Sequence, residues 1–392
     1  MDFRYTEEQQ ALQDTLRRFI ARDYGFDRRR ALVRSELGFS AAAWQAYAEL
    51  GLLALPLPEQ HGGLGGNGID VMAVMELVGE GLLLEPYLST VVLCAGLVRD
   101  CGSAAQCALL LPQVAAGTLQ LALAAYEPGA RYDLAQVQTT ATRAGEGWRL
   151  NGQKSVVLDA PSADYFLVSA RAGAGDGLTL FLVPRTRPGV QVLPYQTQCG
   201  SRAADLALAD VQLAADAVLA APGSALGLLQ RAIDRGAAAL CAEATGIVAA
   251  LNRTTLAYLK NRKQFGVPIG VFQVLQHRMA DMYIAEQQCR SMAIIAAIRA
   301  DTADARLRSQ AIAAAKAYVG RAARFVGQQA VQLHGGMGVV DEMIVSHYFK
   351  RLTMIDMTFG DADFHLARFS DGLYPEAAPS AAAGVRATQA DT

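Results

Sequence analysis

The feature that most constrains the fold of this 392-residue chain is that the period of its hydrophobic pattern changes twice. Up to about Gly117, apolar residues recur at the spacing of an amphipathic helix, as in Leu12, Leu16 and Phe19. From about 119 to 220 the period becomes two, with short β-branched runs such as "DYFLVSA" and "LTLFLVP". From about 223 to 370 helical spacing returns in long stretches. The pattern predicts an α+β fold in the order helical, β, helical.

These changes divide the chain into an N-terminal helical domain (1–118), a middle antiparallel, barrel-like β domain (119–222) and a C-terminal four-helix bundle (223–370). The remainder, 371–392, is rich in Ala, Pro and small polar residues, which predicts a flexible tail. Thr6 followed by "EEQ" predicts the cap of a first helix. Asn151 and Gly152 predict a tight hairpin turn. Long helices are expected over 224–263, 273–300 and 309–333.

Composition removes several classes of function. The 35 Lys and Arg residues against 37 Asp and Glu give a net charge of −2, so no overall field attracts nucleic acid or anionic lipid. Hydrophobic residues make up 52% and charged residues 18%, which excludes global disorder. The uncharged stretch 101–126 contains Pro112 and Gly117 and does not resemble a membrane span. The acidic N-terminus lacks the features of a secretion signal, so a cytoplasmic location is expected.

No residue cluster in the sequence indicates metal or hydrolase chemistry. The six cysteines form no CxxC spacing and are expected to be ordinary buried thiols. The five histidines form no HExxH or HxxH pattern, so no metal site is expected. No GxSxG appears either, so a serine hydrolase is not supported.

Two motifs in the C-terminal third carry groups suited to a phosphate-containing cofactor. The first, "NRKQFGVPIGVFQ", offers a guanidinium, whose fork of donors matches two anionic oxygens at once. The second, "QLHGGMG", offers glycines that let backbone amides approach a phosphate closely. Each has a plainer reading. Arg262 could belong to a solvated basic helix face with Arg253, Lys260 and Lys263, and the glycines could simply end a helix.

These motifs, with "LGLLALPLPEQHGGLGG", "YEPGARYDL" and "LNGQKSVV", resemble the acyl-CoA dehydrogenase family of flavoproteins across nearly the whole chain. Within that family the chain is most similar to small subunits of the pimeloyl-CoA dehydrogenase type, close to steroid side-chain enzymes built from two different chains. The resemblance implies an acyl-CoA dehydrogenase-like fold and FAD as cofactor. It assigns contacts with the ADP half of an adjoining subunit's FAD to Arg262, Gln264, Phe265 and Gln273, and a second set of FAD contacts to Gln332, Gly335, Gly336 and Gly338. His334 is expected to be structural.

The residues that a subunit of this family uses for its own flavin ring are altered here. Tyr126 stands where a threonine is usual, and Arg131 and Tyr132 replace a small Gly-Ser pair. Val156, Val157 and Leu158 replace a Trp-Ile-Thr triplet. The resemblance places the catalytic glutamate at position 359, which is Phe359, or in some members on an earlier helix at position 236, which is Gly236. Asp234 is two residues from that second position and faces another side of the helix.

Asp361 is the carboxylate nearest to the missing glutamate and is the candidate catalytic base. It could instead cap the last helix or replace a hydroxyl that contacts FAD. The sequence leaves open whether Lys316, Arg321 and Arg324 contact CoA or form a solvated helix face.

The losses concern this chain's own flavin site, whereas the residues that reach a neighbour's FAD remain. The resemblance therefore implies a small subunit of an α2β2 acyl-CoA dehydrogenase in lipid or steroid catabolism, with electron-transfer flavoprotein as acceptor. A homologous large subunit would supply the ring contacts and the base that oxidise the acyl-CoA. Two alternatives stay open: a homotetramer with its own FAD and a non-standard base, and a structural subunit without catalysis. The acyl chain cannot be read from the sequence.

Overall fold

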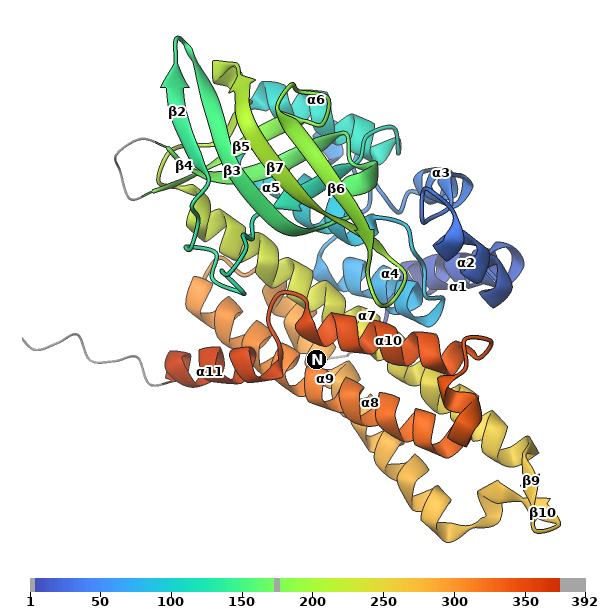
Figure 1. Ribbon diagram of the computed structural model, residues 1–392. Coiled ribbons are helices and arrows are strands. Elements are labelled where there is room, and N and C mark those ends of the chain that lie inside the picture. The colour runs from blue at the N-terminus through green and yellow to red at the C-terminus, as the bar shows by residue number, and fades with distance from the viewer. Residues whose placement is uncertain (1–3, 173–176, 374–392) are drawn as a thin grey trace, which may run out of the picture.

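A computed structural model describes residues 4–172 and 177–373 and has the predicted order of a helical segment, a β segment and a helical segment (Figure 1). The β segment lies above the long helices, and the N-terminal helices lie beside both. The expected divisions at 118 and 222 fall in loops between these groups of elements. The last helix ends at Leu373, and the remainder of the expected tail lies outside the described residues.

The N-terminal third folds into short helices. Thr6 caps the first of them as predicted, because its side chain accepts from Gln9 N while the Gln9 side chain accepts from Thr6 N. One element, η2, has the wider turns of a π-helix and runs directly into α5. The elements are α1 (Glu7–Asp23), α2 (Phe26–Arg34), α3 (Ala41–Glu49), η1 (Glu59–His61), α4 (Gly68–Glu80), η2 (Leu88–Ala95), α5 (Gly96–Cys101) and α6 (Ala104–Ala115).

The middle third forms an eight-stranded sheet with the order β6-β7-β3-β2-β4-β5-β8, to which β1 is joined through β4. Most pairs are antiparallel as predicted, but β4 pairs in parallel with both β1 and β2. The inward side chains of the sheet form a small hydrophobic core separate from the large core of the helices. The strands are β1 (Leu121–Ala124), β2 (Thr140–Ala144), β3 (Gly147–Leu158), β4 (Tyr165–Ala172), β5 (Leu178–Pro184), β6 (Val190–Gln196), β7 (Arg202–Leu213) and β8 (Val218–Ala220).

The prediction of a hairpin turn at Asn151 and Gly152 is wrong. Both residues lie within β3, where the register against β7 shifts and Gly152 has a φ of +154°. A side chain at Gly152 would lie 2.4 Å from Thr139 Oγ1, so glycine is needed there for a close approach of two chain segments. The turn that joins β2 to β3 contains Gly145, whose φ is +61°.

The C-terminal third is a bundle in which α9 packs against α7, α8, α10 and α11. The long helices are α7 (Ala225–Asn261), α8 (Gln273–Ala300) and α9 (Ala305–His334), close to the predicted stretches. Between α7 and α8 lies a projecting tip made of β9 (Lys263–Gln264), β10 (Val267–Pro268) and η5 (Ile269–Val271) (Figure 1). After α9 follow η6 (Gly335–Val339), α10 (Ile344–Met357) and α11 (Ala362–Leu373).

Helix α7 is the central element of the molecule, because it contacts N-terminal helices, bundle helices and the sheet. It crosses α4 so closely that a side chain at Gly246 would lie 1.8 Å from the Glu76 carbonyl oxygen. All six cysteines are free thiols, and five of them are buried. Within 4–172 and 177–373, no helix combines the length and the hydropathy needed to cross a membrane.

Candidate functional site

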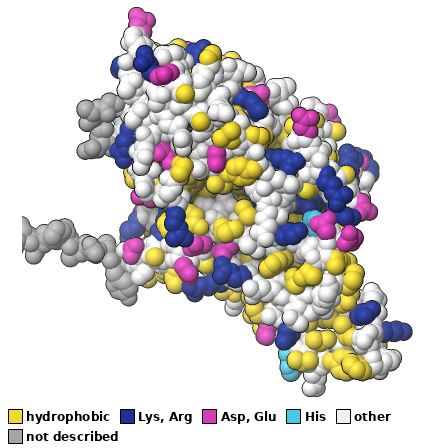
Figure 2. All heavy atoms as spheres, viewed as in Figure 1, with side chains coloured by type: hydrophobic (Ala, Val, Ile, Leu, Met, Phe, Trp, Pro, Cys, Tyr) yellow, Lys and Arg dark blue, Asp and Glu magenta, His cyan; other side chains and the backbone are white. Residues whose placement is uncertain are grey.

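The tip between α7 and α8 presents the first group of candidate FAD residues to the exterior. Phe265 is 91% exposed and has a φ of +57°, a left-handed conformation that an aromatic residue rarely adopts. Its ring lies edge-on to Phe272 at 6.1 Å between centroids. Hydrophobic side chains also gather at this projecting end in the space-filling view (Figure 2). An exposed, strained aromatic on a projecting hairpin is typical of a binding surface.

Arg262 ends α7 and directs an exposed side chain from the tip. Its backbone amide donates to the Tyr258 carbonyl and its carbonyl accepts from Ile269 N, so the backbone is held on both sides. In the described part of the chain, no carboxylate pairs with its guanidinium. Gln264 and Gln273 are exposed on the same tip. The residues thus offer an uncompensated cation on a hydrogen-bonded backbone, with polar neighbours, which suits a pyrophosphate.

The glycine turn at the end of α9 lies beside α7, one helical turn before the tip. His334 stacks on Tyr258 at 4.3 Å between ring centroids, and the Tyr258 hydroxyl donates to the His334 carbonyl at 3.5 Å. His334 Nδ1 lies 2.8 Å from the Ala330 carbonyl oxygen, and burial lowers the pKa of this imidazole. A neutral, buried, stacked histidine fits the structural role expected of it. Through this contact the two candidate FAD segments come together in one region.

The three candidate glycines of that turn differ in what requires them. Gly335 has a φ of +59° and ends the helix in a conformation that favours glycine. A side chain at Gly338 would lie 2.5 Å from the Val331 carbonyl oxygen, so packing excludes one. Gly336 has neither constraint, since nothing lies within 4 Å of where its side chain would be. Gly336 and the neighbouring Gln332 are exposed and free to contact a ligand.

A second region, between the β segment and the C-terminal helices, corresponds to the altered ring site. Figure 2 shows a recess there with hydrophobic side chains on its floor. The structure also has a small apolar hollow, lined by residues of η2, β1, β3 and the 359 turn, without a carboxylate among the residues that line it. Val156, whose φ of +52° is unusual for a β-branched residue, is half-exposed at the rim. The hollow is lined by Ser89, Leu93, Leu123, Ala125, Tyr126, Val156, Leu158 and Phe359.

The two positions where the family resemblance puts the catalytic glutamate converge in space. A side chain at Gly236 would lie 2.8 Å from Phe359 Cε2 and 2.7 Å from Leu93 Cδ2. The phenyl ring of Phe359, which is buried and has a φ of +61°, therefore fills the volume that both positions share. Removal of an α proton from a thioester needs a carboxylate at that point. The hollow has an aromatic ring instead.

Asp361, the candidate base, is engaged in other contacts. Its Oδ1 accepts from Phe364 N, 2.9 Å away, at the start of α11. Its Oδ2 accepts from the Tyr132 hydroxyl at 3.4 Å and lies 3.8 Å from Arg131 Nη2. Tyr132 also packs against Phe364 with 5.1 Å between ring centroids. These contacts favour the capping role and join the altered 131–132 loop to α11; the assignment of Asp361 as a base stays a prediction.

The turn that carries Phe359 is held from behind by two buried groups. Lys316 Nζ donates to the carbonyls of Ile355, Asp356 and Gly360 at 2.8 to 2.9 Å. Burial lowers the pKa of Lys316 to about 8. His365 Nε2 lies 3.0 Å from the Phe359 carbonyl, and burial, with the nearby charges of Lys316 and Arg368, lowers its pKa to about 3. Lys316 therefore neither contacts CoA nor lies on a solvated helix face.

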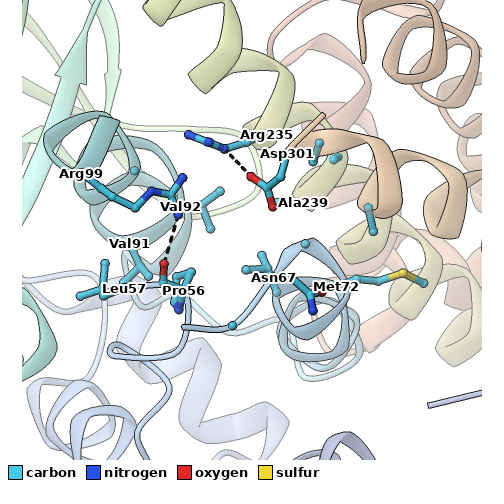
Figure 3. A pocket seen from close by; sticks show the side chains of 17 residues that line it. Pro56, Leu57, Asn67, Met72, Val91, Val92, Arg99, Arg235, Ala239 and Asp301 are labelled. Carbon is cyan, nitrogen blue, oxygen red and sulfur yellow. Dashed lines mark hydrogen bonds and ion pairs between the residues drawn. The ribbon is translucent and has the colours of Figure 1, made fainter. Parts of the chain in front are cut away.

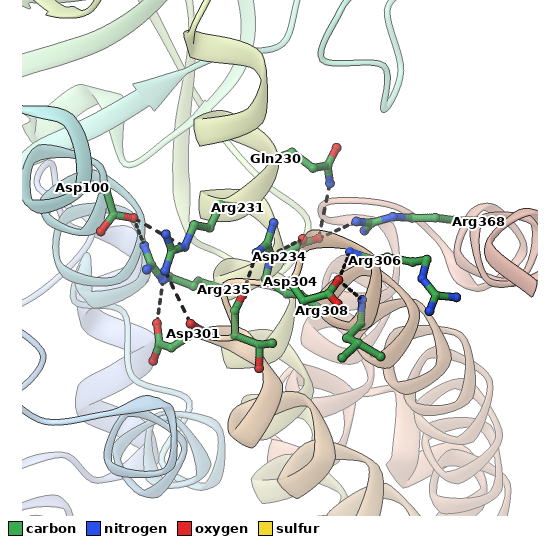
Figure 4. Close-up of polar contacts among 12 residues, drawn as sticks. Asp100, Gln230, Arg231, Asp234, Arg235, Asp301, Asp304, Arg306, Arg308 and Arg368 are labelled. Atoms are coloured by element: carbon green, nitrogen blue, oxygen red, sulfur yellow. Dashed lines mark hydrogen bonds and ion pairs between the residues drawn. The ribbon is translucent and has the colours of Figure 1, made fainter. Parts of the chain in front are cut away.

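Asp234 has no access to the hollow because a buried charge network on α7 holds it (Figure 4). Its carboxylate accepts from Arg308 Nε at 3.0 Å, Arg368 Nη2 at 2.8 Å and Gln230 Nε2 at 3.3 Å. The next residue, Arg235, bonds to Asp100 and Asp301 on other helices. These side chains join α7 to its neighbours and leave no free carboxylate on that face.

Sequence reasoning missed Asp159, a partly buried carboxylate whose partner Ser89 lines the hollow. It accepts from the Ser89 hydroxyl at 2.5 Å, and burial raises its pKa to about 6, against the smaller opposing effect of that hydrogen bond. Its φ of +56° follows a bulge in β3 and was not visible in the sequence pattern. Asp159 is not among the residues that line the hollow.

Metal ligation finds no support in residues 4–172 and 177–373, where no group of three or more His, Cys, Asp or Glu side chains is arranged to hold an ion.

The glutamate of the "YEP" segment has a structural role. Glu127 accepts from Lys154 Nζ at 2.7 Å and from the amides of Gln138 and Thr139 at 2.6 and 3.0 Å.

Comparison with known proteins gives consistent results over the whole length. Residues 6–118, 122–214 and 226–373 match the models of the N-terminal, middle and C-terminal domains of acyl-CoA dehydrogenase. The chain is 30% identical over 372 residues to the probable acyl-CoA dehydrogenase YngJ of Bacillus subtilis (strain 168), covering 93% of this chain and 97% of the relative.

Two similar solved structures are named for pairs of proteins. A variant of the steroid ACAD Tcur3481-Tcur3483 matches with a TM-score of 0.85 and 32% identity over 94% of this chain and 98% of that one. The ChsE4-ChsE5 complex from Mycobacterium tuberculosis matches with a TM-score of 0.88 and 28% identity over 96% of this chain and 100% of that one.

Proposed function

The chain belongs to the acyl-CoA dehydrogenase family of FAD-dependent oxidoreductases, and from that premise we propose that it is the small subunit of a heteromeric α2β2 enzyme. In this assembly the tip of each small subunit clamps the ADP half of the FAD held by a homologous large subunit. The large subunit supplies the contacts to the flavin ring and the carboxylate base. There is then one FAD for each pair of different chains.

The observation that carries this proposal is the contrast between the two ends of α7. At the tip, Arg262 and Phe265 are exposed, and the guanidinium has no carboxylate partner among the described residues. Near the other end, Phe359 and Leu93 fill the point at which a base is needed. A chain that had lost all function in flavin chemistry would have no use for the exposed tip. A chain that worked alone would need a carboxylate base at the point that these two side chains fill.

A second FAD does not fit this chain's own ring site. The 131–132 loop is tied to α11 through Asp361, and Arg131 has a φ of +47°, whereas a cofactor pyrophosphate needs small residues and free amides in such a loop. Asp361 and Asp363, which line the open shelf beside this loop, would repel it. The groups at the tip do fit: a cation for the pyrophosphate, an aromatic face and two amide side chains.

The division of tasks follows from these groups. FAD, when bound, accepts the β hydrogen of the acyl group as hydride. In this chain Arg262 pairs with the pyrophosphate, Phe265 covers apolar surface of the cofactor, and Gln332 with the Gly336 amide binds its polar edge. The stacked His334 and Tyr258 fix the distance between the two segments. These residues bind and orient the cofactor, and none of them removes the α proton.

The similar structures named for two proteins support a partner subunit, and the one named for a steroid ACAD supports an acyl-CoA with a bulky acyl group. A dicarboxylic acyl chain of the pimeloyl type is the alternative substrate class. Electron-transfer flavoprotein as acceptor and a cytoplasmic location complete the proposal.

The decisive experiment measures the FAD-to-chain ratio by visible absorbance, together with the mass of the assembly. The chain is expressed alone and then with candidate large subunits. We expect little FAD in the chain alone and about one FAD per heterodimer with the right partner. One FAD per chain in a homotetramer would establish the alternative in which the chain has its own site.

An Arg262→Ala variant of the complex tests the clamp itself. We expect the FAD content to fall by at least tenfold at equal assembly mass, because a charged hydrogen bond to the pyrophosphate is lost. Arg253→Ala is the matched control, since Arg253 is an exposed arginine on the same helix, paired with Glu80. Unchanged FAD in both variants would favour a purely structural subunit.

A further inference from the structure

The molecule contains a larger cavity on the opposite side of helix η2 from the apolar hollow. It has a volume of about 40 Å3 and lies, partly open to solvent, between the 56–57 loop, α4, η2 and α5, α7 and the end of α8. Ser89 and Leu93 line the hollow on one side of η2, whereas Val91, Val92 and Gly96 line the cavity on the other. The wide turns of a π-helix are often found where a protein binds a ligand. We call this space the α4–α8 cavity.

The walls of the α4–α8 cavity are mainly apolar and its polar groups are few. Figure 3 shows Leu57, Met72, Val91, Val92 and Ala239 around it. The polar side chains that line it are those of Asn67, Arg99, Arg235 and Asp301, from four different elements. An empty void in a protein is normally apolar throughout. An apolar chamber with a small set of convergent polar groups is instead the usual form of a small-molecule site.

The polar rim carries an excess of positive charge. Arg99 donates to Asp100 through Nε at 3.1 Å and to the Pro56 carbonyl through Nη1 at 3.2 Å. Arg235 is bonded to Asp100 and Asp301, and Arg231 lies 3.9 Å from Asp100. Three guanidinium groups therefore share two carboxylates.

Two NH2 groups of this rim remain available. Within the part of the chain that the structure describes, neither Arg99 Nη2 nor Arg235 Nη2 has a hydrogen-bond partner. Both arginines are held in place by their other contacts, so little side-chain entropy is lost when they bind. A carboxylate is the group whose geometry and charge such donors match best.

We propose that the α4–α8 cavity is a binding site for a small amphipathic carboxylate, with the carboxylate at Arg99 and Arg235 and the hydrocarbon part between Met72 and Val92. This site is separate from the FAD and acyl sites and does not depend on the proposed function. Asp301 faces the same space, so the ligand carries one carboxylate and not a more highly charged phosphate.

Gly96 gives a sharp way to block the cavity. It lies in a helix with a φ of −58°, and a side chain there would meet only Arg235 Nη1 at 3.6 Å, an ordinary contact. The backbone therefore accepts a side chain here, and the larger side chain of Gly96→Leu takes up cavity space beside Arg235. Gly227→Leu is the matched control, because Gly227 is exposed in α7 with nothing within 4 Å of the added side chain.

The experiment titrates the protein with octanoate and records heat by calorimetry and the melting temperature Tm. We expect saturable 1:1 binding that raises Tm. Acetate, which has the carboxylate without the chain, and 1-octanol, which has the chain without the charge, should bind at least tenfold more weakly. Gly96→Leu should abolish the response, and Arg99→Gln should weaken it by about tenfold or more. Gly227→Leu and Arg253→Gln should respond as the unmodified protein does.

Three results would overturn the proposal. Absence of binding at millimolar octanoate would mean that the cavity holds water only. Binding that survives Gly96→Leu would place octanoate elsewhere. Equal binding of 1-octanol and octanoate would mean that the arginines take no part.

Discussion

Asp159 has a carboxyl group whose burial opposes its ionisation. Burial raises its pKa from 3.8 to about 6, so between these values the folded protein keeps a proton that the unfolded chain releases. The contribution of Asp159 to the free energy of unfolding should therefore fall as pH rises from about 4 to about 6. Asparagine does not titrate, accepts the Ser89 hydrogen bond and tolerates the left-handed backbone.

We predict that Asp159→Asn is more stable than the unmodified protein by about 3 kcal/mol well above pH 6 and close to it near pH 4. Denaturant unfolding across this pH range is the measurement. Profiles that run parallel over the whole range would show that the Asp159 carboxyl group is well solvated in the folded state.

Asp361 allows the opposite kind of test, in which a substitution should have little effect. Asparagine also caps helices, so Asp361→Asn keeps the bond to Phe364 N and removes only the charge. In the complex with a large subunit we expect the rate of acyl-CoA oxidation, followed by flavin bleaching, to stay within about twofold. If Asp361 were the base, the loss would be about a hundredfold or more.

At the level of elements, the filled hollow makes a prediction about helix α7. Replacing a helical glycine by alanine normally stabilises a protein by about 1 kcal/mol. At Gly236 the added methyl group would meet the buried side chains of Leu93 and Phe359, and overpacking of this kind costs about 1 to 3 kcal/mol. We expect Gly236→Ala to be destabilising and Gly227→Ala, on the same helix, to be stabilising, as measured by urea unfolding. Equal stabilisation by both would mean that the hollow has room for a side chain.

The long elements were predictable because their pattern is local. The stretch expected over 273–300 coincides with α8, and Thr6 caps α1 as its sequence indicates. The features that depend on contacts between distant segments were not predictable. Asn151 and Gly152 have the composition of a turn, but pairing with β7 makes them a bulge. Lys316 has the composition of a surface residue, but the 355–360 turn folds over it.

In the candidate site, too, single positions were predictable and contacts between distant segments were not. The family resemblance gave positions 359 and 236 as the two alternative places of the base, and the structure brings Phe359 and Gly236 together. The contacts between Asp361 and the 131–132 loop could not be predicted from either motif. They join segments that are far apart in the sequence, since Tyr132 and Asp361 are 229 positions apart. The pairing of His334 with Tyr258 is likewise a tertiary contact between two helices.

For the whole molecule, the proposed division of tasks predicts how FAD changes stability. A ligand that binds only the folded state stabilises it, by about 2.7 kcal/mol at a free concentration of a hundred times Kd. We expect added FAD to raise the Tm of the complex with a large subunit and to leave the Tm of the isolated chain unchanged. Differential scanning calorimetry with adenosine as a control ligand measures this. A clear rise for the isolated chain would mean that it holds FAD alone.

Along helix α7, 26 residues separate Gly236 at the filled hollow from Arg262 at the exposed tip, or roughly 40 Å at about 1.5 Å per residue, so the two sites lie far apart. After a gene duplication, mutations that accumulate at one end of such a helix leave the other end intact. One copy can therefore drift to the loss of its own catalytic centre while selection, acting through the other copy, preserves its tip. The distance built into one helix makes an obligate pair of unequal genes an accessible evolutionary outcome.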